Sequence, residues 1–284
     1  MKKMIVKSYA KINLCLDVVG QREDGYHLLD MIMLPLELHD TLILETTLKS
    51  TNFVTLDDFA VGNSQYNTVS NAIDRIDEIK PLNTKFRINL HKVIPMKAGL
   101  GGGSSNAAFI IKAISEYKRL DLTNEEMYQI ATKIGADVPF FITNKPARCR
   151  GIGEQIEPIN VKNNYHVLIV KPEGGCGTKE VYELCDKEKN WPHGGVDIVK
   201  KALEEGDDEL LASSIFNVLE QSSIKLVPEI QTIKDELKEM GFKIVLMSGS
   251  GSAVFALSTD KKFIKKAAKK LENKYNVIVT KVLK

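Results

Sequence analysis

The chain of 284 residues is long enough for one or two domains with a packed core. An apolar content of 43%, a charged content of 27% and a net charge of +2 are ordinary for a globular protein, and exclude a strong field for nucleic acid or a membrane. No apolar run approaches the ~20 residues that a membrane helix needs. The four cysteines lack zinc-site spacing, and we expect free thiols in the cytoplasm: Cys15, Cys149, Cys176 and Cys185.

The first part of the chain predicts mostly strands. Apolar residues alternate from Ala10 to Val18, so Lys11 and Asn13 share the other face of that strand. Asp24-Gly25 is typical of a hairpin turn. A second turn is expected at His39-Asp40. The predicted elements are strands over 10–18, 26–34 and 41–44, a helix over 69–79 that stops before Pro81, and a strand over 86–90.

A glycine-rich run then joins the last of these strands to an apolar-periodic helix. It reads Gly99-Leu100-Gly101-Gly102-Gly103-Ser104-Ser105-Asn106. The glycines let a ligand approach the backbone, and Ser104, Ser105 and Asn106 are good N-cap residues. Unpaired N–H groups at a helix start bind anions, so the run predicts a phosphate site.

The glycine-rich run does not fit the two best-known phosphate motifs. No lysine follows the glycines, as a Walker A loop requires. The glycine spacing also differs from that of the dinucleotide fingerprint. A tight strand-to-helix turn without a ligand is the alternative.

A helix with a capping box follows, from Thr123 and Glu126 to Gly135. Asp137 comes directly afterwards, before Val138-Pro139. Taken alone, this aspartate is best explained as a plain helix N-cap.

The second half of the chain begins near residue 160, which predicts two domains, 1–160 and 161–284. A strand over 165–170 leads into helical patterns near 178–186, 195–205 and 207–222. A helix from Pro228 to Gly241, strands over 242–247 and 253–257, a lysine-rich helix and a strand over 277–282 complete the chain. This order fits a ferredoxin-like α+β layer, with the lysines on a solvated helix face.

Four segments in this order resemble the GHMP kinase superfamily. They are the strand Tyr9 to Leu14, the glycine-rich run, Gly135 to Phe140, and the small-residue loop Met247 to Ala253. The resemblance implies an α+β fold with a ribosomal-protein-S5-domain-2-like N-terminal domain and a ferredoxin-like C-terminal domain. It also implies an ATP-dependent kinase that uses Mg²⁺ and acts on a small molecule.

The resemblance assigns roles to individual residues. Asp137 is the expected base, and Lys11 supports it. Asp24-Gly25-Tyr26-His27 narrows the resemblance to members whose alcohol carries a cytidine diphosphate, used in isoprenoid precursor synthesis. The expected nucleotide-binding residues are Pro95, Gly99, Leu100, Gly101, Gly102, Gly103, Ser104, Ser105, Asn106 and Asn67. The expected substrate-binding residues are Asn13, Tyr26, His27, Tyr182, Gly249 and Ser250, and the metal ligands are left open.

Two alternatives remain for function. One is a GHMP kinase for another small alcohol, such as homoserine or mevalonate, and the other is a non-catalytic nucleotide-binding relative. Cys176-Gly177 and Val218 depart from the family pattern and bear on the identity of the acceptor. We expect a monomer or homodimer that binds neither nucleic acid nor membrane.

Overall fold

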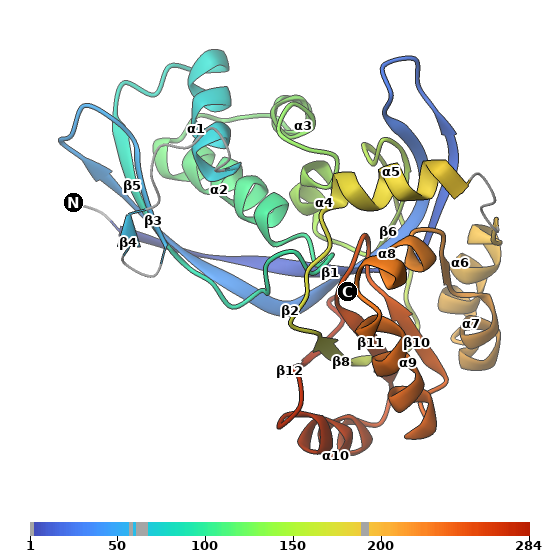
Figure 1. Cartoon of the computed structure of the whole chain (residues 1–284). Helices are drawn as coiled ribbons and strands as arrows, with labels where there is room; N and C mark the ends of the chain where they lie inside the picture. The colour runs from blue at the N-terminus through green and yellow to red at the C-terminus, as the bar shows by residue number, and fades with distance from the viewer. Residues whose placement is uncertain (1–2, 57–58, 61–67, 189–192) are drawn as a thin grey trace. The chain divides into compact units, whose positions relative to one another are not determined.

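The computed structural model describes residues 3–56, 59–60, 68–188 and 193–284 (Figure 1). The chain forms two compact units. The first contains residues up to Ala10, Leu38–Ile94 and Gly101–Asn144, and the second contains Lys11–Glu37, Pro95–Leu100 and Lys145–Lys284. Among the described residues, no helix is both long and apolar enough to cross a membrane. The domain division near residue 160 stays a prediction.

Two long strands, β1 (Lys3–Gln21) and β2 (His27–Thr47), contribute residues to both units. In the first unit, the end of β2 pairs antiparallel with β5 (Lys85–His91), and β5 pairs in parallel with β3 (Phe53–Leu56). A short β4 (Phe59–Ala60) extends this arrangement. The helices of this unit are α1 (Thr68–Ile79), α2 (Gly102–Lys118), α3 (Asn124–Thr132) and α4 (Val138–Thr143).

Two local predictions for the first unit need correction. No turn occurs at His39-Asp40, because β2 continues through both residues. Asp40 is fully buried, and its carboxylate accepts the N–H groups of residues 93–94 at 2.8 Å. Its side chain therefore hydrogen-bonds a segment far along the chain and does not form a local turn. The helix from Thr123 has the predicted capping box but ends at Thr132, before Gly135.

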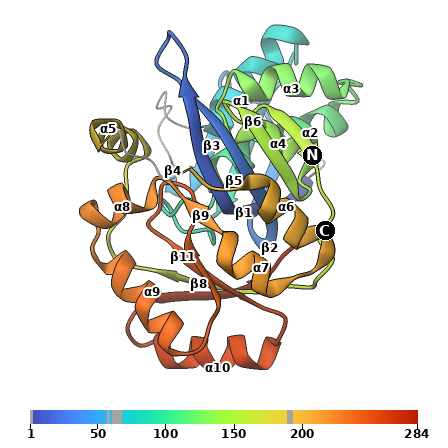
Figure 2. The same cartoon turned by 90° about the vertical axis from the view of Figure 1, so that its right-hand side faces the viewer.

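The second unit contains an antiparallel four-stranded sheet with the order β10-β11-β8-β12. Its strands are β8 (His166–Lys171), β10 (Ile244–Met247), β11 (Val254–Ser258) and β12 (Asn276–Lys281). Helices α9 (Glu229–Glu239) and α10 (Lys261–Leu271) pack on it, as Figure 2 shows. This strand order and the antiparallel pairing confirm the ferredoxin-like layer. The apolar side of α10 is buried and its lysines lie on the other side.

The remaining elements of the second unit include three strands that the sequence did not predict. The helical pattern over 207–222 is broken by β9 (Phe216–Asn217), which pairs in parallel with Cys15 and Leu16 of β1. It separates α7 (Asp208–Ser214) from α8 (Glu220–Leu226). The others are β6 (Ala147–Gly151), β7 (Gln155–Pro158), α5 (Thr178–Glu188) and α6 (Val196–Glu205).

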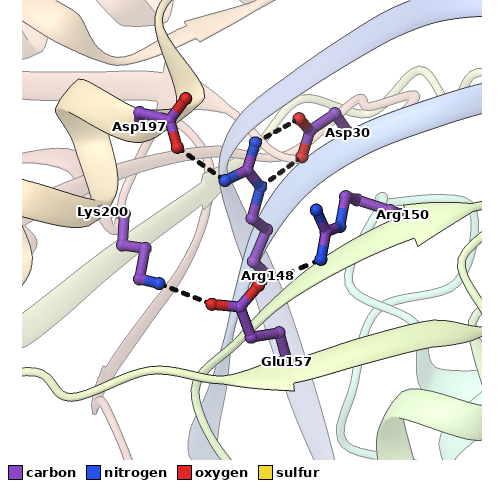
Figure 3. A network of polar contacts seen from close by, with 6 residues as sticks. All are labelled: Asp30, Arg148, Arg150, Glu157, Asp197 and Lys200. Atoms are coloured by element: carbon purple, nitrogen blue, oxygen red, sulfur yellow. Dashed lines mark hydrogen bonds and ion pairs between the residues drawn. The ribbon is translucent and has the colours of Figure 1, made fainter.

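A network of ion pairs fastens α6 to the strands of the second unit (Figure 3). The Arg148 guanidinium on β6 binds both carboxylate oxygens of Asp30 on β2, at 2.6 and 2.8 Å, and reaches Asp197 on α6 at 2.6 Å. The bonds to Asp30 raise the pKa of Arg148. Glu157 on β7 joins Lys200 of α6 to Arg150, at 2.5 and 3.1 Å. The planar guanidinium fork suits such paired contacts, so this network fixes the start of α6.

Candidate active site

The glycine-rich loop passes twice through the left-handed region before α2 begins. Gly99 has a φ of 73° and Gly101 a φ of 71°, values that residues with a Cβ rarely adopt. Helix α2 starts at Gly102, with Gly101 as its N-cap and no side-chain capping bond. The prediction that Ser104, Ser105 or Asn106 caps the helix is therefore wrong. The left-handed Gly101 turns the chain into the helix by itself, and the three polar residues fall inside the first two turns.

The hydrogen bonds of this loop are distributed unevenly between its acceptors and its donors. The carbonyl of Leu100 accepts the Lys11 N–H, and that of Gly99 accepts the Ser248 hydroxyl, both at 3.0 Å. Within the described part of the chain, the N–H groups from Gly99 to Ser104 donate to no other group. Uncommitted donors at the positive end of a helix favour an anion, and the phosphate site expected from the sequence stays a prediction.

A buried polar network lies behind this loop in the first unit. The Asn106 carboxamide donates to Ser8 Oγ at 2.6 Å and to Asp40 Oδ2 at 3.0 Å. Lys92 forms an ion pair with Asp40, whose other oxygen binds the backbone of residues 93–94. Asn106 thus ties α2 to the segment that leads into the loop. Asp40 and Lys92 were not predicted, because only the fold brings them to Asn106.

Asp137 occupies the N-cap position of α4 without acting as a cap. Its side chain makes no capping hydrogen bond, and its backbone has helical angles (φ −83°, ψ −11°) in place of the extended ones of an ordinary cap. The carboxylate is therefore not used to cap α4. The structure thus does not support the interpretation of Asp137 as a plain N-cap.

Lys11 and Asn13 are buried side by side on β1, with exposed fractions of 3% and 0%. Lys11 Nζ donates to Asn13 Oδ1 at 2.6 Å, and the Asn13 N–H donates to Ser248 Oγ at 3.3 Å. The simple alternative of a solvated strand lysine is wrong. A buried ammonium group is costly to desolvate unless it is hydrogen-bonded, and here Asn13 supplies one such bond.

The small-residue loop Met247–Ala253 meets the glycine-rich loop within the second unit. A Cβ atom added to Gly249 would stand 3.1 Å from the Gly99 carbonyl oxygen, 3.3 Å from Lys11 Nζ and 3.4 Å from Asn13 Oδ1. Ser250 Oγ lies 3.1 Å from Thr178 Oγ1 at the start of α5. The structure therefore brings together four of the predicted positions: Lys11, Asn13, Gly99 and Gly249.

The predicted base-recognition residues lie at the β1–β2 hairpin and on α5. The hairpin turn is confirmed, since the Arg22 N–H donates to the Tyr26 carbonyl at 2.8 Å. The His27 and Tyr182 rings stack with centroids 4.6 Å apart, and His27 Nε2 lies 2.7 Å from Asp186 Oδ1. Tyr26 is 59% exposed.

Asp186 also belongs to this group and was not predicted from the sequence. It follows Tyr182 by four residues, and a helix places such residues on one face. That spacing is the signal by which Asp186 could have been found.

The donor set for a metal ion is sparse. Within the described ranges, no group of three or more His, Cys, Asp or Glu side chains could hold a metal. The buried Ser105 hydroxyl, in the first turns of α2, has no hydrogen-bond partner among the described residues.

Pro95 opens the glycine-rich loop and is half-buried, and Asn67 lies outside the described residues.

Comparison with known proteins shows the family of this chain. The family model for the N-terminal domain of GHMP kinases matches residues 67–145, and that for the C-terminal domain matches residues 199–277. A Clostridium botulinum protein named 4-diphosphocytidyl-2-C-methyl-D-erythritol kinase is 37% identical over 90% of this chain and 91% of its own length. A Clostridium kluyveri protein of the same name is 36% identical over 97% of this chain and 98% of its own. The chain belongs to the GHMP kinase family.

Solved structures show the same fold. A crystal structure of 4-(cytidine 5'-diphospho)-2C-methyl-D-erythritol kinase matches with a TM-score of 0.83 and 30% identity, covering 98% of this chain and 99% of that one. The homoserine kinase of Cytophaga hutchinsonii and the mevalonate kinase of Methanococcus jannaschii, each with a TM-score of 0.71 and 18% identity, share the fold alone. Their coverage of this chain is 98% and 100%, and of their own chains 94% and 99%.

Proposed function

We propose that this GHMP kinase transfers the γ-phosphoryl group of ATP to the 2-hydroxyl of 4-diphosphocytidyl-2-C-methyl-D-erythritol, a step in isoprenoid precursor synthesis. The named relatives support this substrate, since they align with this chain over nearly its whole length. The observation that carries the proposal is the group formed by His27, Tyr182 and Asp186. Aromatic faces and an oriented imidazole suit a nucleobase, which homoserine and mevalonate do not have.

A few side chains and backbone groups divide the chemistry of this reaction. Asp137 accepts the proton of the substrate hydroxyl as the oxygen attacks the γ-phosphorus, and ADP leaves. Lys11 supplies a fixed positive charge where negative charge develops, and Asn13 holds its ammonium group at 2.6 Å. The N–H groups from Gly99 to Ser104 bind the phosphate oxygens of ATP.

Mg²⁺ fits this arrangement as an ion held mainly by phosphate. It would neutralise charge on the ATP phosphates, and it commonly keeps only one or two protein ligands. The absence of an acidic cluster among the described residues agrees with that kind of site. Ser105, with its unpartnered hydroxyl, is the residue that we expect near the ion.

In the proposed base site, Asp186 fixes the orientation of the His27 ring. A carboxylate 2.7 Å from Nε2 favours a proton on that nitrogen and holds the imidazole plane. His27 then reads the cytosine edge, while Tyr26 and Tyr182 supply faces for stacking. In the structure the imidazole covers one face of Tyr182, so a base that stacks on this face must displace His27.

A measurement of ADP formation across a panel of alcohols tests the proposal. The panel contains 4-diphosphocytidyl-2-C-methyl-D-erythritol, 2-C-methyl-D-erythritol 4-phosphate, homoserine and mevalonate, each with ATP and Mg²⁺. The proposal expects the first compound to have the highest kcat/KM and loss of the cytidine to reduce it strongly. A higher kcat/KM for homoserine or mevalonate would contradict the proposal.

A further inference from the structure

The loop from Met247 to Ala253 shows an imbalance between its acceptors and its donors. The carbonyl groups of Met247, Ser248, Gly249 and Ser250 all accept hydrogen bonds. Of the N–H groups in the same stretch, those of Gly249 and Ser250 donate to no partner among the described residues. Because backbone polar groups are normally paired, two adjacent unused donors point to a ligand that accepts hydrogen bonds.

Asn217 holds two of these carbonyl groups. Its Nδ2 donates to the Met247 oxygen at 3.0 Å and to the Gly249 oxygen at 2.8 Å. Its Oδ1 accepts the N–H of Leu219 at 3.0 Å. A backbone N–H can only donate, so this third bond fixes which end of the carboxamide faces the loop.

Because the peptide bond is planar, the contact of Asn217 with the Gly249 carbonyl also sets the direction of the Ser250 N–H. In a trans peptide, the carbonyl of one residue and the N–H of the next point in opposite directions. With the Gly249 carbonyl held by Asn217, the Ser250 N–H must point away from Asn217. Gly249 has a φ of 55°, and a glycine can rotate this peptide at little cost, so the orientation depends on the contact from Asn217.

The residues around Asn217 anchor it firmly. Asn217 lies on β9, which pairs with β1, and the Val218 N–H donates to the Leu16 carbonyl at 3.1 Å. Three residues later, the buried Glu220 carboxylate accepts the Met247 N–H at 3.0 Å and forms an ion pair with Lys234. These contacts fix the position of Asn217 relative to the loop.

We propose that Asn217 is a positioning residue, which locks the Gly249–Ser250 peptide so that the N–H groups of Gly249 and Ser250 bind a diphosphate. This inference rests on the proposed function, because both substrates of that reaction carry a diphosphate. The shared chemistry is the phosphate oxygen, and the two sources are ATP and the cytidyl substrate. Asn217 itself touches neither of them.

Inorganic pyrophosphate tests the anion site without reference to any acceptor alcohol. The measurement follows the amide resonances of Gly249 and Ser250 by NMR during a titration of the full chain. We expect both resonances to shift in the wild type, and a tenfold or larger loss of pyrophosphate affinity in Asn217→Asp. The carboxylate has the same size as the amide but cannot donate to the two carbonyl oxygens.

Steady-state kinetics of Asn217→Asp identify the source of the diphosphate. A raised KM for the cytidyl substrate alone assigns the site to that substrate, and a raised KM for ATP alone assigns it to ATP. Asn163→Ala is the matched control, since Asn163 Nδ2 also donates to a backbone carbonyl, that of Gly206, at 3.0 Å. We expect this control to lower the melting temperature without changing either KM.

Two outcomes would overturn the inference. One is a folded Asn217→Asp variant whose affinities for pyrophosphate, ATP and the cytidyl substrate are all unchanged. The other is a wild type in which pyrophosphate leaves both amide resonances in place. If Asn217→Asp does not fold, Asn217→Ser is measured in its place, with the same expected loss. A wild type that binds pyrophosphate but does not phosphorylate the cytidyl substrate would refute the proposed function and leave this inference standing.

Discussion

The backbones of Gly99 and Ser248 are in direct contact, and no side chain fits between them. A Cβ atom added to Gly99 would stand 1.8 Å from the Ser248 carbonyl oxygen, and the Ser248 hydroxyl donates to the Gly99 carbonyl at 3.0 Å. The same hydroxyl accepts the Asn13 N–H at 3.3 Å. Ser248 therefore joins the glycine-rich loop to the strand that carries Lys11.

This contact predicts that Gly99→Ala is much more harmful than an alanine at a glycine in open space. The left-handed backbone costs about 1–2 kcal/mol, and the clash adds about 1–3 kcal/mol. Gly25→Ala is the control, because Gly25 has a φ of 87° and no atom within 4 Å of an added Cβ. Urea denaturation should show the larger loss for Gly99→Ala. Equal losses would mean that the Gly99–Ser248 contact contributes nothing.

Gly103→Ala tests whether an ATP phosphate approaches this glycine, because the fold itself has space for a Cβ atom there. An added Cβ would find its nearest neighbour, Thr68 Oγ1, at an ordinary 3.7 Å, so the variant should fold. Since alanine favours helix over glycine by about 1 kcal/mol, the melting temperature should not fall. If ATP phosphates approach this backbone, the KM for ATP should rise at least about tenfold, or about 1.4 kcal/mol.

Gly102 is a poorer choice for this test, because its added Cβ would already meet Lys92 Nζ at 3.0 Å and Ile94 Cγ2 at 3.1 Å. Gly20→Ala is a suitable control outside the loop, with its nearest contact at 3.5 Å. An unchanged KM for ATP in Gly103→Ala would show that no phosphate lies against this turn of α2.

Local patterns predicted the glycine-rich loop, the β1–β2 hairpin, the capping box at Thr123 and the ferredoxin-like layer. The loop, the hairpin and the capping box depend on neighbouring residues, and the order of strands and helices along the chain indicates the layer, so the sequence carries these signals directly. The failures depend on distant partners. Asp40 was assigned to a turn because its partners at residues 93–94 lie far along the chain, and β9 has only two residues, too few to show a period.

Some residues of the candidate site were predicted from the sequence, and others were missed or misjudged. The burial of Lys11 could not be read from β1, because polar residues on a strand usually face water. Asp137 was placed correctly at a helix start, but only the folded structure shows that it makes no capping bond. Asp186 and Asn217 were missed because their partners come from other elements.

Base recognition predicts a selective loss in kcat/KM. Removing the hydrogen bond in His27→Ala leaves a buried polar group of the base unpaired, at a cost of about 1–3 kcal/mol. This corresponds to a roughly ten- to hundredfold lower kcat/KM for the cytidyl substrate. Tyr182→Ala should show a comparable loss, and neither change should alter the KM for ATP. With 2-C-methyl-D-erythritol 4-phosphate both variants should match the wild type, and a loss there would contradict base recognition.

The buried thiols should be inert in the folded protein. Burial raises the pKa of Cys15 to about 12 and that of Cys185 to about 11, so both remain protonated where an unfolded thiol ionises. Between pH 8 and 9.5 a thiol reagent should label the native protein slowly and at a constant rate, but label the urea-unfolded chain faster as the pH rises. Because unfolding above pH 9 releases these protons, the thiols also lower the free energy of unfolding as the pH rises. Rapid native labelling at Cys15 would contradict its burial.

The most direct test is phosphoryl transfer from ATP to 4-diphosphocytidyl-2-C-methyl-D-erythritol by the wild type and by Asp137→Asn, followed by ³¹P NMR. The wild type should give a new phosphomonoester on the 2-hydroxyl. The Asp137→Asn variant keeps the size and the capping ability of the side chain, so it should fold, and it should react about 10²–10⁴-fold more slowly. Near-native turnover by the folded variant, or a wild type that leaves this substrate unchanged while it phosphorylates mevalonate or homoserine, would contradict the account.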